Sequence, residues 1–201
     1  MRAVGERRLG PSARGVSLVA LGLGVGALTS VGQTYLDRPW AALTNSAGAW
    51  LVAPFVAGAL MPSRRGAATI GLITCSFELV GYYATAHARG FSAGGSILVF
   101  WAICALIGGP LYGLAGQLWR HGPRVMRGLG GTALPAVFLA EGLWVYHHQL
   151  HYEITAVLWG VIAAALLVLS WRPVHLRWFP LTLGACLFAE VVLSAAYSQS
   201  F

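Results

Sequence analysis

Lysine is absent from the sequence, and acidic residues are scarce, with six among 201 residues. Without lysine, a retinal Schiff base and any lysine-dependent chemistry are excluded. The chain also lacks a P-loop, a Rossmann glycine pattern and a GxSxG elbow, which excludes an autonomous NTPase or serine hydrolase. The three cysteines, Cys75, Cys104 and Cys186, all lie in apolar stretches. We therefore expect small buried packing residues rather than a disulfide framework.

Apolar residues dominate what is present. Hydrophobic residues make up 57% of the chain and charged residues only 9%, whereas a soluble domain carries about 25% charge. The apolar residues form blocks of about 20 residues, the length that crosses the hydrocarbon core of a bilayer as a helix. The sequence predicts an all-α membrane protein, a bundle of seven transmembrane helices. The predicted spans are Val16 to Tyr35, Trp40 to Leu60, Ala67 to Ala86, Ser96 to Leu118, Leu129 to Tyr146, Ile154 to Leu169 and Phe179 to Tyr197.

The arginines indicate how this bundle is oriented. Only Arg38 and Arg89 fall in the loops after spans 1 and 3, whereas eleven arginines precede span 1 or lie in the alternate loops. This asymmetry predicts a cytoplasmic N-terminus and an outer C-terminus in a multi-pass protein of the bacterial cytoplasmic membrane, built as one helix plus three helical hairpins. We expect residues 1–14 to form a basic cytoplasmic tail and residues 15–201 a single membrane domain. The first apolar run is longer than that of a signal peptide and is expected to remain as span 1.

Glycine and proline suggest where helices pack and bend. Gly22 with Gly26, and Gly109 with Gly113, have the GxxxG spacing that lets helix backbones approach closely. Gly108, Gly109 and Pro110 remove side-chain bulk and one backbone donor near the centre of span 4. We expect a break in the hydrogen-bond ladder there, either as a bend that fits the bundle or as a broken helix that lines a cavity.

Three of the six acidic residues lie within predicted spans at the same depth. Glu78, Glu141 and Glu190 follow the last arginine before their spans by 13, 14 and 13 residues, which is about 20 Å along a helix. Span 1 carries Gln33 near its outer end. A carboxyl group within the bilayer is costly and usually faces the bundle interior. We expect the three glutamates to face one shared interior space, with at least one of them protonated at neutral pH.

Polar and aromatic residues at helical spacing surround these glutamates. Such groups can hold a cationic ligand or shelter a carbocation, and a protonated glutamate can act as a proton carrier or general acid. Two other interpretations stay open: the glutamates join helices by hydrogen bonds, and the tyrosines form the outer aromatic belt. The candidate ligand-binding or proton-coupling residues are Glu78, Glu141, Glu190, Gln33, Tyr82, Trp144, His148 and Tyr197.

The loop after span 5 holds the densest group of metal-competent side chains. His147, His148 and His151 lie here with Glu153. No cysteine or second histidine pair accompanies them, so an exposed polar loop is the favoured interpretation, with pH sensing or weak metal binding as the alternative. We predict no metal site and no cofactor.

Several short stretches resemble a family of unknown function that comprises small bacterial polytopic membrane proteins. They are the run from Asn45 to Leu60, GlyTyrTyr at 81–83, PheTrp at 100–101, GlyGlyPro at 108–110 and LeuAlaGluGlyLeu at 139–143. This resemblance implies a bacterial membrane protein and no particular activity. A weaker similarity, of PheGluLeuVal at 77–80 to small seven-helix membrane terpene cyclases, implies an enzyme with Glu78 as proton donor and Glu190 in the place of a late aspartate.

Three functions are compatible with these observations. The first is binding or transport of a small cationic or amphipathic solute in an intramembrane cavity, coupled to protonation of Glu78, Glu141 or Glu190. The second is a membrane-embedded cyclase or isomerase of prenyl lipids, in which Glu78 and Glu190 are the catalytic residues. The third is a non-catalytic partner subunit. The expected partners are the lipid bilayer and a small lipophilic ligand, with an oligomer or partner subunit possible and no nucleic acid, because the arginines follow membrane topology.

Overall fold

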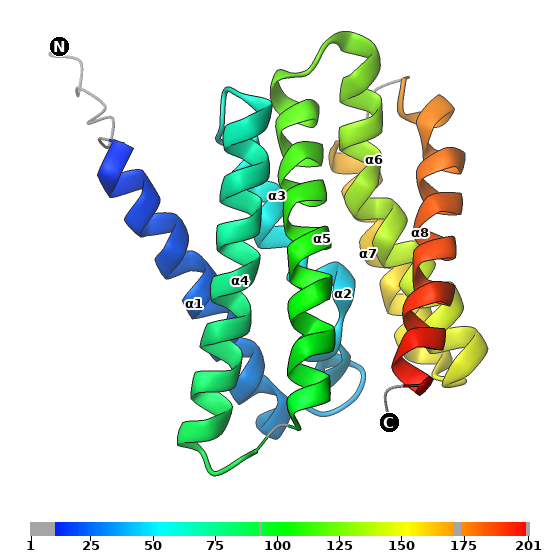
Figure 1. The fold of residues 1–201 in the computed structure, drawn as a ribbon. Helices are drawn as coiled ribbons and strands as arrows, with labels where there is room; N and C mark the ends of the chain where they lie inside the picture. Colours follow the sequence, from blue (N-terminus) through cyan, green and yellow to red (C-terminus); the bar gives the residue numbers. More distant parts are fainter. Residues whose placement is uncertain (1–10, 93, 171–173, 200–201) are drawn as a thin grey trace, which may run out of the picture.

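The structure is a computed structural model that describes residues 11–92, 94–170 and 174–199. These residues form eight α-helices, a 3-10 helix and a π-helix, and none of them forms a strand (Figure 1). The elements are α1 (Pro11–Tyr35), η1 (Trp40–Asn45), α2 (Ala47–Trp50), α3 (Val52–Ala59), α4 (Arg64–Ala88), α5 (Gly95–His121), α6 (Arg124–Glu141), η2 (Gly142–Gln149), α7 (Glu153–Leu169) and α8 (His175–Gln199).

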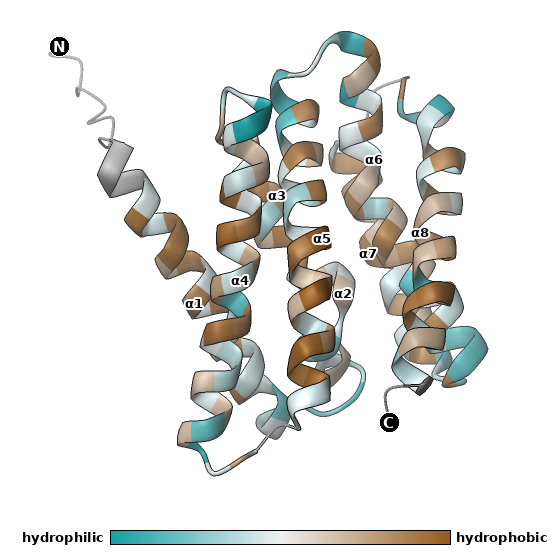
Figure 2. Cartoon of the chain, in the orientation of Figure 1, coloured by the Kyte–Doolittle hydropathy of each residue, from teal (hydrophilic) through white to brown (hydrophobic). Residues whose placement is uncertain are grey.

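The helices have the length and composition of a multi-pass membrane protein. Five stretches are long and apolar enough to cross a bilayer, namely Gly15–Tyr35, Arg64–Ala88, Gly95–His121, Arg124–Gln149 and Arg177–Ser198. Two shorter apolar stretches, Ala47–Ala59 and Glu153–Leu169, lie between them. Hydrophobic residues cover the middle of the helices, while hydrophilic residues gather at the helix ends and loops (Figure 2). The outward faces are apolar, as lipid contact requires: Leu106, Ile107 and Leu111 of α5 are each more than half exposed.

The helices pack in an order that brings distant parts of the chain together. Helix α1 lies against α4, α4 against α5, and α5 against both α3 and α6, while α6 also contacts α7 and α8. Helix α1 begins and α8 ends at opposite ends of the bundle (Figure 1). The start of α4 at Arg64, the last turn of α5 with Arg120 and the start of α6 at Arg124 lie at one end (Figure 1). We call the opposite end, formed by residues 36–46, 89–92 and 149–153, the arginine-poor end.

The predicted GxxxG contacts are confirmed. A Cβ atom on Gly26 of α1 would lie 1.9 Å from the carbonyl oxygen of Glu78 in α4. A Cβ on Gly113 of α5 would lie 2.2 Å from the carbonyl oxygen of Ala67 in the same helix α4. Only glycine permits such distances, because any side chain would push the backbones apart. Both predicted glycine pairs therefore set how closely α1 and α5 approach α4.

Of the two forms predicted for the break in span 4, the broken helix is wrong. Helix α5 runs without interruption from Gly95 to His121, with Pro110 inside it. Its glycines serve packing instead: a Cβ on Gly109 would lie 2.7 Å from the carbonyl oxygen of Gly71. Helix α5 is held on two sides by α4 and α3. This packing keeps the helix continuous although proline removes one hydrogen bond, as neighbouring helices often do in membrane proteins.

Span 2 is also not the single helix that was predicted, because Trp40 to Leu60 is divided into η1, α2 and α3. The backbone is extended at Ser46, whose hydroxyl accepts a hydrogen bond from the N–H of Ala49 and so caps a new helix. The helix type changes within span 5, because the α-helix α6 ends at Glu141 and the chain continues as the π-helix η2. Both irregular segments adjoin Glu141.

One boundary prediction meets the described residues only in part. Of the predicted tail 1–14, residues 1–10 lie outside the described residues, and α1 already begins at Pro11.

The hydrophobic core of the bundle is centred on the fully buried Trp159 of α7, which packs against Phe138 and Tyr146. This core joins α6, η2 and α7.

Candidate functional site

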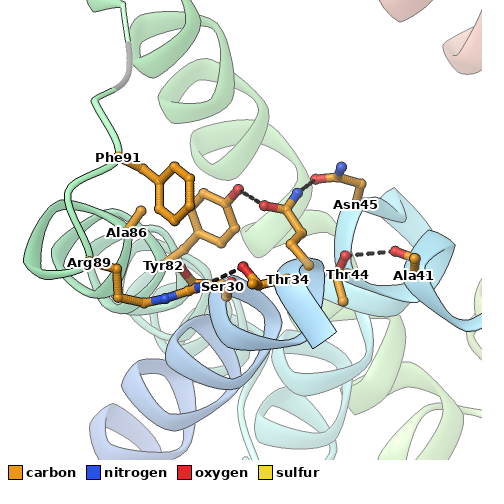
Figure 3. A pocket seen from close by; sticks show the side chains of 10 residues that line it. Ser30, Thr34, Ala41, Thr44, Asn45, Tyr82, Ala86, Arg89 and Phe91 are labelled. Atoms are coloured by element: carbon orange, nitrogen blue, oxygen red, sulfur yellow. Dashed lines mark hydrogen bonds between the residues drawn. The ribbon is translucent and has the colours of Figure 1, made fainter. Parts of the chain in front are cut away.

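A cavity of about 460 Å³ lies at the arginine-poor end, between α1, η1 and α4 (Figure 3). Its walls mix polar and apolar groups. The lining residues are Ser30, Gln33, Thr34, Ala41, Thr44, Asn45, Tyr82, Ala86, Arg89 and Phe91. A site of this size that combines apolar walls with a few convergent polar groups has the character of a small-molecule pocket. We call it the outer pocket, after the orientation that the arginines predict.

A chain of side-chain hydrogen bonds crosses the outer pocket. The Tyr82 hydroxyl donates to Oε1 of Gln33 at 2.5 Å, and Nε2 of Gln33 donates to Oδ1 of Asn45 at 2.5 Å (Figure 3). The ring of Trp50 in α2 packs 5.5 Å from the Tyr82 ring, centroid to centroid, and its Nε1 donates to the carbonyl oxygen of Thr44. Three segments of the chain, α1, η1 and α4, are thus joined around one space.

Arg89 supplies the positive charge of the outer pocket. Its guanidinium donates to the carbonyl oxygen of Ser30 and to the hydroxyl of Thr34, both in α1. The guanidinium carbon also lies 5.2 Å from the centroid of the Phe91 ring, a cation–π distance. Arg89 was not among the predicted site residues. The sequence did contain a signal for it, because Arg89 is one of only two arginines in the loops after predicted spans 1 and 3.

The carboxyl group of Glu141 is held by hydrogen bonds from other segments of the chain. Its Oε2 accepts hydrogen bonds from the Ser46 hydroxyl at 2.7 Å and from the Gly48 N–H at 3.0 Å, while the Tyr146 hydroxyl lies 3.4 Å from Oε1. The Tyr146 hydroxyl also contacts the carbonyl oxygen of Ala42 in η1. Glu141 therefore fastens the end of α6 to the start of α2, directly after the residues of η1 that line the outer pocket.

Glu78 is buried as well, but it differs from Glu141 in its hydrogen bonding. It is fully inaccessible to solvent, and neither of its carboxyl oxygens has a hydrogen bond of normal distance and angle. The thiol of Cys75, one turn earlier in α4, is close enough to interact with it, but a thiol is only a weak donor. The hydroxyl of Thr74, one turn earlier on the same face of α4, likewise has no partner. The polar group nearest in sequence on this face toward the arginine-poor end is Tyr82, which lines the outer pocket.

The remaining predicted residues lie on the α6, η2 and α8 side of the bundle. Glu190 is 6% exposed and lies within electrostatic range of Glu141. Trp144 stacks on His148 at 4.7 Å between centroids and donates through Nε1 to the Ser194 hydroxyl at 3.3 Å. Tyr197 packs against Phe100 of α5 at 5.6 Å.

The structure thus brings some predicted residues together and leaves others apart. Gln33 and Tyr82 meet in the outer pocket, and Trp144 and His148 meet on η2. None of the three glutamates lines the outer pocket. None lines a second cavity of about 430 Å³ either, whose walls are wholly apolar and come from α1, η1, α2, α3, α6 and α7. Neither cavity is therefore the predicted space shared by the three glutamates, although Glu141 and Glu190 lie within electrostatic range of each other.

The histidine loop is an exposed polar turn. His147 pairs with Glu153 at 2.9 Å, and the two side chains are about 60% exposed. His151 has a positive φ of 54° at the turn into α7. Within residues 11–92, 94–170 and 174–199, no group of three or more histidine, cysteine or acidic side chains is arranged to hold a metal ion.

Comparison with known proteins assigns the chain to a family. The chain belongs to the family of unknown function DUF6518, whose model matches residues 6–200. The predicted resemblance to such a family is confirmed. No curated protein and no solved structure matches the chain.

Proposed function

We propose that this protein is a seven-span membrane protein that binds a small amphipathic molecule in the outer pocket. The observation that carries the proposal is the pocket itself, in which the Tyr82–Gln33–Asn45 chain and Arg89 face apolar walls formed by Ala86 and Phe91. A molecule with one polar end and one apolar end matches both kinds of wall.

The seven-span topology is supported by two observations. The five long apolar stretches account for five crossings, and two more crossings are supplied if Ala47–Ala59 together with η1 forms one and Glu153–Leu169 forms another. An odd number of crossings also agrees with α1 starting and α8 ending at opposite ends of the bundle (Figure 1). With the N-terminus in the cytoplasm, the arginine-poor end faces outward and the outer pocket opens away from the cytoplasm.

The glutamates have different parts in this proposal. Glu141 acts as a structural link, because its carboxyl group is held by Ser46 and Gly48. Glu78 is the candidate for proton coupling, since it lies one helical turn below Tyr82 and has no competing hydrogen bond. Transport would require that protonation of Glu78 changes the affinity of the pocket, and a Glu78→Gln variant with unchanged pH dependence of binding would argue for binding alone.

The enzyme alternative has less support. A prenyl-lipid cyclase that uses Glu78 and Glu190 needs both carboxyl groups beside the substrate. Neither of the two cavities described above is lined by Glu78 or Glu190.

The test is to fill the pocket. Ala86→Trp places a large ring in the outer pocket, whereas Val161→Trp places the same ring on the outward face of α7, where Val161 is 58% exposed. Both variants and the wild type are purified in lipid nanodiscs, and the small molecules that co-purify are identified by mass spectrometry. We expect a compound that is present with the wild type and Val161→Trp and missing with Ala86→Trp. Identical small-molecule profiles for all three proteins would refute the proposal.

A further inference from the structure

We propose that the ligand of the outer pocket carries an anionic group, a carboxylate or a phosphate ester, and that Arg89 is the residue that recognises it. This inference rests on the proposed function and specifies the chemical class of the ligand. It replaces the expectation of a cationic solute, which depended on glutamates that do not line the pocket.

The charge of the outer pocket is the first argument. Arg89 is the only charged side chain among its ten lining residues. Within the described part of the chain, the single ion pair joins His147 and Glu153, so no carboxylate there neutralises Arg89. A half-buried guanidinium without a counter-ion attracts an anion more strongly than an arginine in open water, because the surrounding dielectric is lower.

The balance of donors and acceptors is the second argument. Three of the acceptors along the pocket already accept a hydrogen bond from the protein: Gln33 Oε1 from Tyr82, Asn45 Oδ1 from Gln33, and the Thr34 hydroxyl from Arg89. The donors are in surplus. Arg89 has five N–H groups, of which its contacts with Ser30 and Thr34 use two. A donor-rich space favours a ligand group that only accepts, such as a carboxylate or phosphate, over an ammonium group.

The distribution of arginines is the third and independent argument. Arginine is disfavoured in the outer loops, where only Arg38 and Arg89 occur. Both have structural contacts: Arg38 lies over the Tyr152 ring at 4.5 Å, and Arg89 bonds to α1 and lies over Phe91. Arg89 differs because it also lines a cavity, where its remaining N–H groups are available to a ligand.

Binding of matched probes tests the inference. The probes are octyl phosphate, octanoate and octylammonium, which share one tail and differ in charge, and binding to the protein in phosphatidylcholine nanodiscs is measured by titration calorimetry. We expect octyl phosphate and octanoate to bind at least about tenfold more tightly than octylammonium, with an affinity that falls as salt is added. Octylammonium binding as tightly as octyl phosphate would overturn the inference.

Variants assign the preference to Arg89. Arg89→Gln should lose the anion preference and Arg89→Lys should retain most of it, while Arg38→Gln, the matched outer-loop control, should behave as the wild type. If Arg89→Gln does not fold, the Arg89→Lys variant and the salt dependence still decide, because a preference unaffected by salt contradicts recognition by charge. An Arg89→Gln protein that folds and keeps the preference also overturns the inference.

Failure of the inference and failure of the proposed function give different results. If probes bind in a way that Ala86→Trp abolishes but without preference for anions, the pocket is right and the anionic class is wrong. If no probe binding depends on Ala86, the proposed function itself fails. Nanodiscs that contain phosphatidylglycerol identify the source: suppressed octyl phosphate binding indicates a lipid headgroup, and unchanged binding indicates a soluble amphiphile.

Discussion

Replacement of Glu141 by leucine should destabilise the protein, whereas the same replacement of Glu78 should leave it as stable or more stable. The two side chains are buried to a similar degree, 3% and 0% exposed, and leucine is close to glutamate in size. They differ in hydrogen bonding. Glu141 accepts from Ser46 and Gly48, while both carboxyl oxygens of Glu78 are without a partner.

The magnitudes follow from the cost of buried polar groups. Leucine at Glu141 leaves the Ser46 hydroxyl and the Gly48 N–H without their acceptor, at about 1–3 kcal/mol each, so we expect a loss of about 3 kcal/mol in the free energy of unfolding. Leucine at Glu78 removes two polar atoms that have no partner, and we expect a gain of about 1 kcal/mol. For a chain of this size these values correspond to a Tm lowered by about 6–12 °C and raised by about 2–4 °C.

Thermal unfolding of both variants in nanodiscs, followed by tryptophan fluorescence, measures the difference. Glu153→Leu is the control, because Glu153 is exposed beside His147 and its replacement should change the free energy of unfolding by no more than about 0.5 kcal/mol. The reasoning is refuted if Glu78→Leu lowers the Tm as much as Glu141→Leu, since the carboxyl group of Glu78 would then have a stabilising partner that the structure lacks.

Three further predictions concern the fold. Gly26→Ala should weaken the packing of α1 on α4 and lower the Tm, because the new Cβ would lie 1.9 Å from the Glu78 carbonyl oxygen. Gly24→Ala is the control, since a Cβ there would have no atom within 4 Å and the Tm should not fall. Equal Tm values for the two variants would contradict the close contact. Pro110→Ala should leave the Tm unchanged or raise it, since α5 is already continuous there; a clear decrease would mean that the proline itself shapes the helix. A reporter enzyme fused after the C-terminus should be active outside the cytoplasm, and activity only in the cytoplasm would contradict the predicted topology.

The correct sequence-based predictions came from local patterns. Helices α4, α5, α7 and α8 contain the third, fourth, sixth and seventh predicted spans, because the length of an apolar run depends only on neighbouring residues. The contacts of Gly26 and Gly113 were predictable for a similar reason: two glycines one turn apart make a flat surface wherever the helix lies. Burial of the glutamates followed from the cost of placing a carboxyl group in lipid.

The incorrect predictions concerned what neighbouring helices do to a local pattern. Pro110 predicted a broken helix, but α5, packed between α3 and α4, continues through it. The apolar run from Trp40 to Leu60 predicts one helix. In the structure, however, the carboxyl group of Glu141, 95 residues after Ser46, accepts hydrogen bonds from the Ser46 hydroxyl and the Gly48 N–H and stabilises the start of a new helix. The strength of these interactions depends on contacts that no local window contains.

The sequence by itself therefore determined that the chain is a helical membrane protein and that its charged residues are few and unequally distributed, because apolar length and charge are properties of single segments. Only the tertiary structure decided that Glu141 links two helices, that Glu78 has no hydrogen bond of normal geometry and that Arg89 meets Gln33 and Tyr82 in one pocket. Those outcomes depend on which faces of α1, η1 and α4 turn toward each other. Helix rotation in the bundle is set by the close glycine contacts between neighbouring helices rather than by the hydrophobicity of any one of them.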